Sequence, residues 1–348
     1  MNKGILIVYN TCTIGRVSHE GWNKDIDSIL SQDFKDYDVI VSECRGSRTD
    51  IDDNINVSNF IERATSSGFL YNITREQLSC FATLNHSLRQ AVKKRGPYEY
   101  YMHMTSGIEF PTKDFFTSLY NWLKSNEDVG RAILAIEGTD NFFPPPFGYP
   151  YDQKDTDDGA YPPESLNTEP LQITPGYAAA EHCWVYPHKM YESYGERVAP
   201  DMYISNGAGA LYSYLTAAIG KKNSIVPWNV VPRLIHKRTQ DGPTKMPYPD
   251  SWWIKNRTLE EVTRLTQRLD ENCVFVDTYC AERSPKWIGR TQQHLSEDHK
   301  KAILEKFGED GLALSEKERD DLRKFLKQEF FVTKDIIDYD NINSTLIE

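Results

Sequence analysis

Short apolar runs alternate with helical patterns through the first 137 residues of the chain, and few folds accommodate that alternation. Between the runs, apolar residues recur three or four positions apart, as they do on one face of a helix. Strands joined by helices of this length form right-handed crossovers, and helices then cover both faces of a mainly parallel sheet. The pattern therefore predicts an α/β fold with strands at 4–9, 37–42, 69–74, 98–104 and 131–137.

The alternation stops between residues 138 and 176. This segment contains three consecutive prolines and an aspartate-rich run, neither of which continues a helix or strand easily. Loops of this length inside a domain are usually binding loops, lids or disordered segments. Beyond about residue 258 the sequence turns to charged helical patterns with capping-box starts. We predict a main domain at 1–258 and a mainly helical extension at 259–348, which either packs on the main domain or binds a partner.

The charge balance and the cysteines restrict the classes of function. The chain has 51 acidic and 40 basic residues and a formal net charge of -11, whereas nucleic-acid-binding proteins normally present a basic face. Its 6 cysteines are scattered without a C-x-x-C pair, so the sequence shows neither zinc-ligand spacing nor a disulfide framework. No segment approaches the roughly 18 uninterrupted apolar residues of a membrane span. We expect a cytoplasmic protein with buried free thiols that has no nucleic acid as its primary ligand and spans no membrane.

A series of longer segments carries a more specific pattern. These segments are Gly4–Thr11, Ile26–Phe34, Asp38–Ser47, Leu84–Ala91, Tyr100–Pro111, His182–Gly195 and Ser205–Gly220, followed by Ile225–Pro227. Their order along residues 4–238 resembles the order of strands and helices in GT-A glycosyltransferases, the Rossmann-like nucleotide-diphospho-sugar transferases, and among these the family-2 enzymes. Residues beyond 238 are not covered by this resemblance.

The resemblance implies a nucleotide-sugar site at the ends of the first, second and fourth strands. By position, Asn10, Thr11 and Glu43 would hold the nucleobase and ribose. A carboxylate suits this task because it accepts hydrogen bonds from ribose hydroxyls or a base N–H. Arg45 either contacts a phosphate or pairs with Glu43. The Asp-x-Asp motif of the family would fall on a segment that here reads Thr105, Ser106, Gly107.

Threonine and glycine in place of two aspartates leave open how the diphosphate is neutralised. Mn²⁺ and Mg²⁺ are hard cations that want anionic oxygen ligands, which these side chains cannot supply. Either Glu109 and His236 form a displaced metal site, or the enzyme is metal-independent and basic side chains neutralise the leaving diphosphate. In a third alternative, the fold binds its ligand without turnover. The basic candidates are Lys221, Lys222, Arg233, Lys237 and Arg238.

The catalytic base and the acceptor contacts are assigned by position in the family. An inverting enzyme needs a carboxylate that deprotonates the attacking hydroxyl. The family's base position falls in a segment that contains Asn206 but no acid, and Asp201 is the nearest carboxylate. Without a base, the alternative is a retaining route in which the departing phosphate accepts the proton. Trp184, Trp252 and Trp253 are the candidates for stacking against the sugar rings of an acceptor.

The sequence thus predicts transfer of a sugar from a nucleoside diphosphate donor, with UDP-sugars favoured, to a glycan or other hydroxyl acceptor. A second hypothesis is a catalytically silent module that binds a sugar nucleotide or glycan in the same pocket. A nucleotidyltransferase is a third and weaker hypothesis, because it would need a glycine-rich phosphate loop after the first strand. The segment 10–16 contains only Gly15.

Overall fold

The computed structural model describes residues 3–11, 19–45, 55–75, 80–137, 171–172, 183–198, 216, 219–236 and 338–348. The helices in these ranges are α1 (His19–Leu30), α2 (Ile55–Ser66), α3 (Cys80–Arg95), α4 (Phe115–Ser125), α5 (His188–Ser193) and the 3-10 helix η5 (Tyr339–Asn341). None of the helices described is long and apolar enough to cross a membrane. The strands are β1 (Lys3–Asn10), β2 (Tyr37–Cys44), β3 (Leu70–Thr74), β4 (Tyr98–Thr105), β5 (Ile108–Glu109), β6 (Val129–Ile133), β7 (Ile136–Glu137), β8 (Leu171–Gln172), β9 (Cys183–Pro187), β10 (Lys222–Ile225), β11 (Leu234–His236) and β12 (Ser344–Ile347).

Most strands belong to one mixed, mainly parallel sheet, with the order β12-β3-β2-β1-β4-β9-β6-β10-β8 over the described ranges. β3, β2, β1 and β4 are parallel neighbours. β9 pairs antiparallel with both β4 and β6, so β4 and β6 still point the same way, and β10 is parallel to β6. The predicted α/β class with a mainly parallel sheet is confirmed, although the sequence pattern does not predict the antiparallel β9 in its centre.

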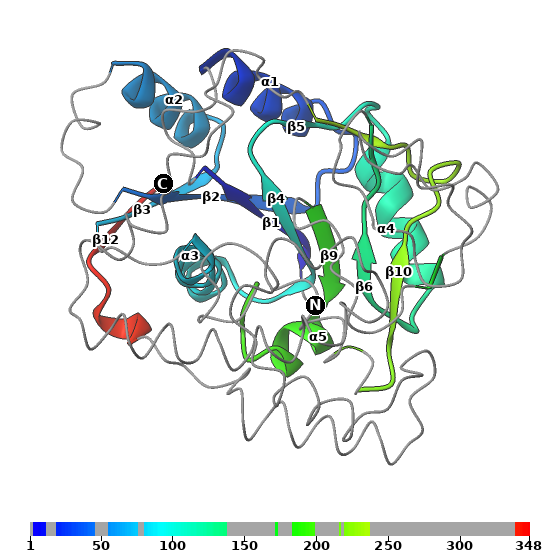
Figure 1. Ribbon diagram of the computed structural model, residues 1–348. Coiled ribbons are helices and arrows are strands. Elements are labelled where there is room, and N and C mark those ends of the chain that lie inside the picture. The colour runs from blue at the N-terminus through cyan, green and yellow to red at the C-terminus, as the bar shows by residue number, and fades with distance from the viewer. Residues whose placement is uncertain are drawn as a thin grey trace, which may run out of the picture.

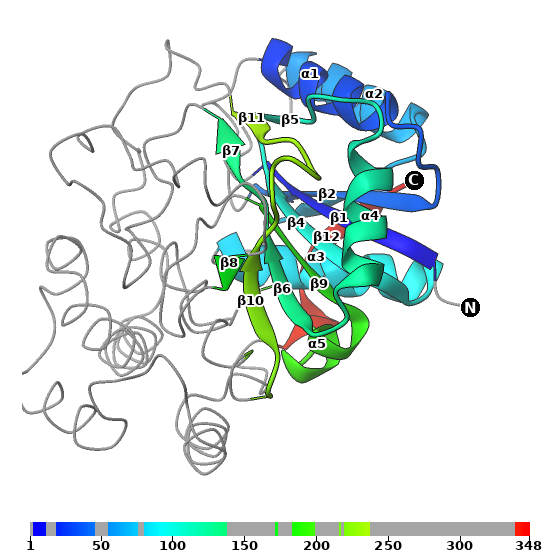
Figure 2. The ribbon, with the colours of Figure 1, turned by 90° about the vertical axis from the view of Figure 1, so that its right-hand side faces the viewer.

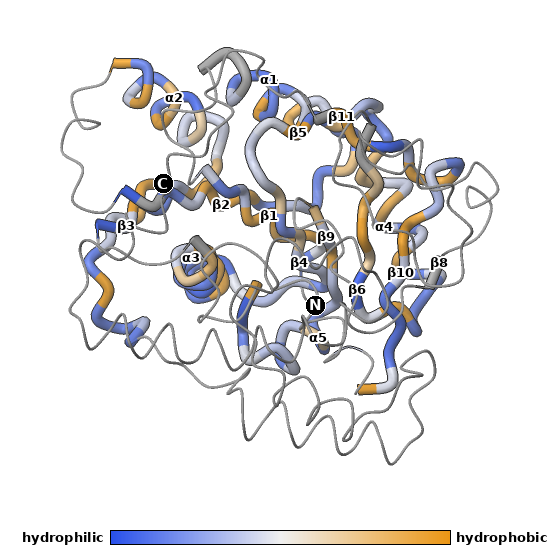
Figure 3. The backbone as a smooth tube through the Cα atoms, in the orientation of Figure 1, coloured by the Kyte–Doolittle hydropathy of each residue, from blue (hydrophilic) through white to orange (hydrophobic). Residues whose placement is uncertain are grey.

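Helices cover both faces of this sheet (Figure 1, Figure 2). α1 and α2 pack together on one face, while α3 lies on the other face against β1, β2 and β3, and α5 against β4 and β9. Figure 3 shows hydrophobic residues along the central strands between these layers. Every residue of β1 after Lys3 is buried, because a central parallel strand is covered on both faces. A second, small sheet with the order β5-β11-β7 follows the carboxyl ends of β4 and β6.

The last described segment returns to the main sheet. β12 pairs antiparallel with β3, with Ser344 opposite Thr74 and Ile347 opposite Tyr71. β12 is therefore part of the main sheet, a strand that the sequence pattern of the mainly helical extension at 259–348 does not predict. Residues 259–337 lie outside the described residues, as does the 138–176 loop apart from β8.

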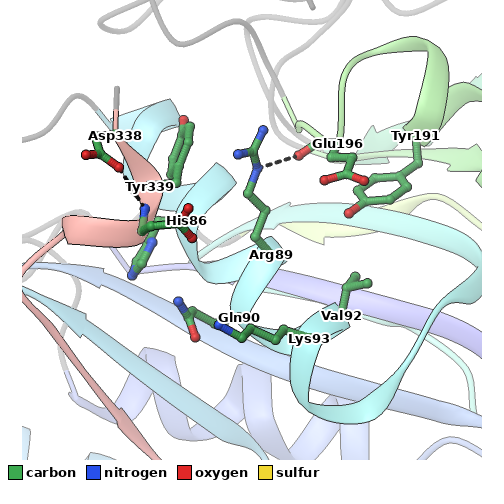
Figure 4. A pocket seen from close by; sticks show the side chains of 10 residues that line it. His86, Arg89, Gln90, Val92, Lys93, Tyr191, Glu196, Asp338 and Tyr339 are labelled. Atoms are coloured by element: carbon green, nitrogen blue, oxygen red, sulfur yellow. Dashed lines mark hydrogen bonds between the residues drawn. The ribbon is translucent and has the colours of Figure 1, made fainter. Parts of the chain in front are cut away.

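Side chains of α3 hold this C-terminal segment in place (Figure 4). Tyr339 stacks on His86 with ring centroids 6.3 Å apart and planes 9° apart, and the Arg89 guanidinium carbon lies 4.2 Å from the Tyr339 ring centroid. The His86 Nε2 is 2.7 Å from the Ser344 Oγ. Burial, and then the positive charge of Arg89, lower the pKa of His86 from 6.5 to about 4.

This lowered pKa predicts a loss of stability in mild acid. Above pH 6.5 His86 is neutral in the folded and the unfolded chain, whereas between pH 6.5 and about 4 the unfolded chain takes up the proton more readily. We expect this one group to lower the free energy of unfolding by about 2 kcal/mol between pH 7.5 and pH 5. Urea denaturation at the two pH values measures the effect, with His86→Asn as the control. Equal pH dependence of the two proteins would contradict the assignment.

Candidate functional site

The carboxyl ends of β1, β2 and β4 meet at one edge of the sheet, as the sequence predicts. Asn10 lies in register with Ser42 of β2 on one side and Thr105 of β4 on the other. Its carbonyl oxygen accepts a hydrogen bond from the Ser106 N–H (3.0 Å). The Thr11 N–H and Oγ1 both donate to the Ser42 carbonyl oxygen (3.0 and 3.1 Å). The candidate residues of the first and fourth strands are thus neighbours that are tied to one another.

Glu43 and Arg45 form a buried ion pair at the end of β2. The Glu43 side chain is 0% exposed and the Arg45 side chain 4%. One Glu43 carboxylate oxygen accepts from the Arg45 Nε, and the other accepts from the Tyr71 hydroxyl (2.5 Å). Burial, and then the negative charge of Glu43, raise the pKa of Tyr71 well above its ordinary value, so the phenol stays protonated and donates. Of the two roles that the sequence leaves open for Arg45, the structure shows the pairing with Glu43.

The Thr105–Gly107 turn is held by a residue that the sequence patterns do not single out. Gly107 has a φ of +87°, a left-handed conformation that favours glycine. Its N–H donates to Asp25 Oδ2 on α1 (2.7 Å), and the same oxygen accepts from the Tyr9 hydroxyl (2.6 Å). Asp25 is 1% exposed and stands three residues after Trp22 on the buried face of α1. A charged residue on the apolar face of a helix is the sequence signal that could have identified it.

The predicted metal ligands, Glu109 and His236, lie on neighbouring strands of the small sheet but not opposite each other. Glu109 of β5 is in register with Ile235 of β11 and not with His236. In the part of the chain that the structure describes, no three His, Cys, Asp or Glu side chains gather as metal ligands. The 105–107 turn offers no carboxylate, and Asp25 Oδ2 already accepts two hydrogen bonds. These residues do not fit a divalent cation held in the way an Asp-x-Asp motif holds it.

Two of the basic candidates, Lys221 and Lys222, lie at the wrong edge of the sheet. β10 runs parallel to β6, so Lys222 at its start lies at the amino edge, away from the end of β4. There the Lys222 Nζ pairs with Asp128, and the Lys221 Nζ donates to the Glu127 carbonyl oxygen (2.7 Å). The prediction that these two lysines neutralise a diphosphate is therefore wrong, because strand direction carries them away from the site.

Arg233 lies near the carboxyl edge of the sheet, as the candidate site does. It immediately precedes β11, which pairs with β5, the strand that follows the Thr105–Gly107 turn. The Arg233 guanidinium carbon is 5.6 Å from the Trp228 ring centroid. It therefore stays a candidate for neutralising a diphosphate. The other assigned residues lie outside the described residues: Asp201, Asn206, Lys237, Arg238, Trp252 and Trp253.

Trp184 lies in the core and not at a surface where a sugar could stack. Its side chain is 0% exposed within β9. The His103 ring lies 4.4 Å away, centroid to centroid, and the Arg131 guanidinium carbon lies 4.7 Å from the indole. The predicted acceptor-binding role does not fit this position, because β9 is a central strand with a neighbour on each side.

The fold is similar to that of solved glycosyltransferases, at low sequence identity. A structure of GalNAc-T7 with UDP, GalNAc and Mn²⁺ matches with a TM-score of 0.50 and 13% identity, over 95% of this chain and 57% of that chain. S. aureus TarS 1–349 in complex with UDP matches with a TM-score of 0.47 and 13% identity, over 95% of this chain and 89% of that chain. No protein-family model matches the sequence, and no curated protein matches it significantly. The chain thus has an α/β fold similar to that of the GT-A glycosyltransferases.

Proposed function

We propose that this protein is a glycosyltransferase that transfers a sugar from a UDP-sugar to a hydroxyl group of a glycan or other acceptor. The observation that carries the proposal is the meeting of Asn10, Glu43 and Thr105 at the carboxyl edge of a GT-A-like sheet. In open α/β sheets, ligands bind beyond the carboxyl ends of the strands. GalNAc-T7, which is similar in fold, was solved with UDP, GalNAc and Mn²⁺.

The side chains at this edge would each contribute according to their chemistry. The Glu43 side chain is 0% exposed, so a direct contact with the base or ribose does not fit its position. Its carboxylate would instead hold the Arg45 guanidinium and the Tyr71 hydroxyl at the end of β2, behind the nucleoside, while Arg45 offsets its negative charge next to an anionic donor. Thr105 and Ser106 would present hydroxyls to the diphosphate, as short polar side chains do at many phosphate sites.

The proposed reaction forms a bond between the acceptor oxygen and the anomeric carbon. It breaks the bond between that carbon and the diphosphate, which leaves as UDP. The acceptor proton goes to Asp201 in an inverting route, or to the leaving phosphate in a retaining route. Because the 105–107 turn does not fit a divalent cation, Arg233 is the proposed counter-charge for the leaving group.

Thermal shift with nucleotides tests the proposal. A ligand at 100 times its Kd stabilises the folded state by about 2.7 kcal/mol, which raises Tm by several degrees. We expect UDP at millimolar concentration to give such a shift in the presence of EDTA, and GDP and CMP to give smaller shifts. Release of free sugar from UDP-sugars, measured under the same conditions, reports turnover. No shift with any of the three nucleotides, with or without Mn²⁺, would contradict the proposal.

A second candidate function is binding without turnover. The observation in its favour is the absence of a carboxylate on the 105–107 turn, where the family's enzymes carry their metal ligands. A UDP shift together with no release or transfer of sugar from any UDP-sugar would favour this binding module over the enzyme.

A further inference from the structure

Asp25 of α1 and Gln32 just after it fasten the β4–α4 segment, which runs from the end of β4 into the first turn of α4, at two buried points. Near the start of that segment, Asp25 Oδ2 accepts from the Gly107 N–H (2.7 Å). Further along, Gln32 Nε2 donates to the Thr112 carbonyl oxygen (2.9 Å), and Gln32 Oε1 accepts from the Phe116 N–H (3.1 Å). Asp25 is 1% exposed and Gln32 0%, so water does not compete well for these bonds. Of the two side chains, Asp25 is the one that reaches the turn where the donor diphosphate is proposed to lie.

Two backbone N–H groups of this turn are committed to the protein. The Ser106 N–H donates to the Asn10 carbonyl oxygen (3.0 Å), and the Gly107 N–H donates to Asp25. These bonds direct both N–H groups toward protein acceptors and not toward a ligand. The contribution of the turn to a bound donor would therefore come from its side chains, whose placement depends on the path of the backbone that these two bonds hold.

We propose that Asp25 is a positioning residue for the donor diphosphate, which fixes the Thr105–Gly107 turn from its protein side without touching the donor. This inference rests on the proposed function. The Tyr9 hydroxyl donates to the same carboxylate oxygen (2.6 Å) and so holds the carboxylate in turn. A carboxyl oxygen suits the task because it can accept both hydrogen bonds at once, one from the Tyr9 hydroxyl and one from the Gly107 N–H.

Gln32 offers a matched control for this role. Its side chain is also buried and also bonds to the backbone of the β4–α4 segment, but at Thr112 and Phe116 and not at the turn. A residue that only stabilises the fold would lower Tm without changing the affinity for donor. Asp25→Ala and Gln32→Ala are therefore compared by Tm and by the Kd for UDP, measured by calorimetry on the full chain.

We expect Asp25→Ala to weaken UDP binding about tenfold or more, and Gln32→Ala to leave it within about twofold while lowering Tm comparably. Asp25→Asn, which restores an uncharged acceptor for the Gly107 N–H, is expected to recover most of the affinity, to within about threefold of wild type.

If Asp25→Ala does not fold, the variant Gly107→Ala carries the test. It strains the same turn at φ +87° and is expected to weaken binding to a similar extent. Unchanged affinity in the turn variants, or an equal loss in Gln32→Ala, would overturn the role of Asp25. Failure of the wild-type protein to bind UDP would instead overturn the proposed function, and this inference with it.

Discussion

Replacing Glu43 with alanine is expected to lower the free energy of unfolding by about 3–5 kcal/mol and to remove measurable UDP binding. The substitution removes the carboxylate opposite the Arg45 guanidinium, whose side chain is 4% exposed. It also removes the acceptor of the Tyr71 hydroxyl in the core. A buried charge that loses its counter-charge costs far more than an exposed one. Urea denaturation measures the first effect, and calorimetric titration with UDP measures the second.

Two further variants separate the effects of charge and position. Glu62→Ala removes an exposed carboxylate from α2 and is expected to change stability by less than about 0.5 kcal/mol. The double variant Glu43→Ala with Arg45→Ala removes both charges, and we expect it to be more stable than Glu43→Ala alone. If Glu43→Ala is as stable as Glu62→Ala and binds UDP like the wild-type protein, the role assigned to this ion pair is wrong.

Gly4→Ala is expected to lower the free energy of unfolding by about 3 kcal/mol, although it adds a single methyl group. A Cβ at this position would lie 2.3 Å from the Asp36 carbonyl oxygen and 3.0 Å from Asp36 Oδ2. The same carbonyl oxygen accepts from the Ile5 N–H (3.0 Å) at the start of the β1–β2 pairing. Because the nearest obstacle is backbone, the strand itself has to shift, and β1 is a central strand of the sheet.

Thermal denaturation of Gly4→Ala and Lys3→Ala tests this steric explanation. Lys3 precedes Gly4 in the same strand, and its Nζ pairs with Asp38 (3.0 Å) at a half-exposed position. Such surface pairs contribute about 0–1 kcal/mol, so Lys3→Ala should lower Tm only slightly. A Tm for Gly4→Ala equal to that of Lys3→Ala would show that the close approach to Asp36 does not constrain the strand.

The sheet could be predicted from the sequence where its strands are buried on both faces. β1 and the middle of β2 read as apolar, β-branched runs, and β3, β4 and β6 as short segments in which apolar and aromatic residues predominate. The helical spacing between the strands implies parallel crossovers. β12 could not be predicted in this way, because Ser344–Ile347 is a short edge strand whose partner β3 lies far away in the sequence. β9 was missed as an antiparallel strand for a related reason, since hydrophobicity does not specify strand direction.

The candidate site shows the same division between local and long-range information. Asn10, Glu43 and Thr105 could be grouped from the sequence because the carboxyl ends of parallel strands share one edge. Asp25 could be singled out as a charged residue on the apolar face of a helix, but its contact with Gly107 could not be predicted, because it joins residues 82 positions apart. Lys222 was placed wrongly because its position depends on the direction of β10, which the sequence pattern does not reveal.

Hydrogen–deuterium exchange with and without UDP tests the central claim most directly, because it reports where the nucleotide binds as well as whether it binds. We predict that saturating UDP slows exchange together at residues 10–11, 43–45 and 105–107, the three strand ends that meet at the carboxyl edge. Slower exchange confined to another region, such as the contact between α3 and η5, with no change at the three strand ends, would contradict the account.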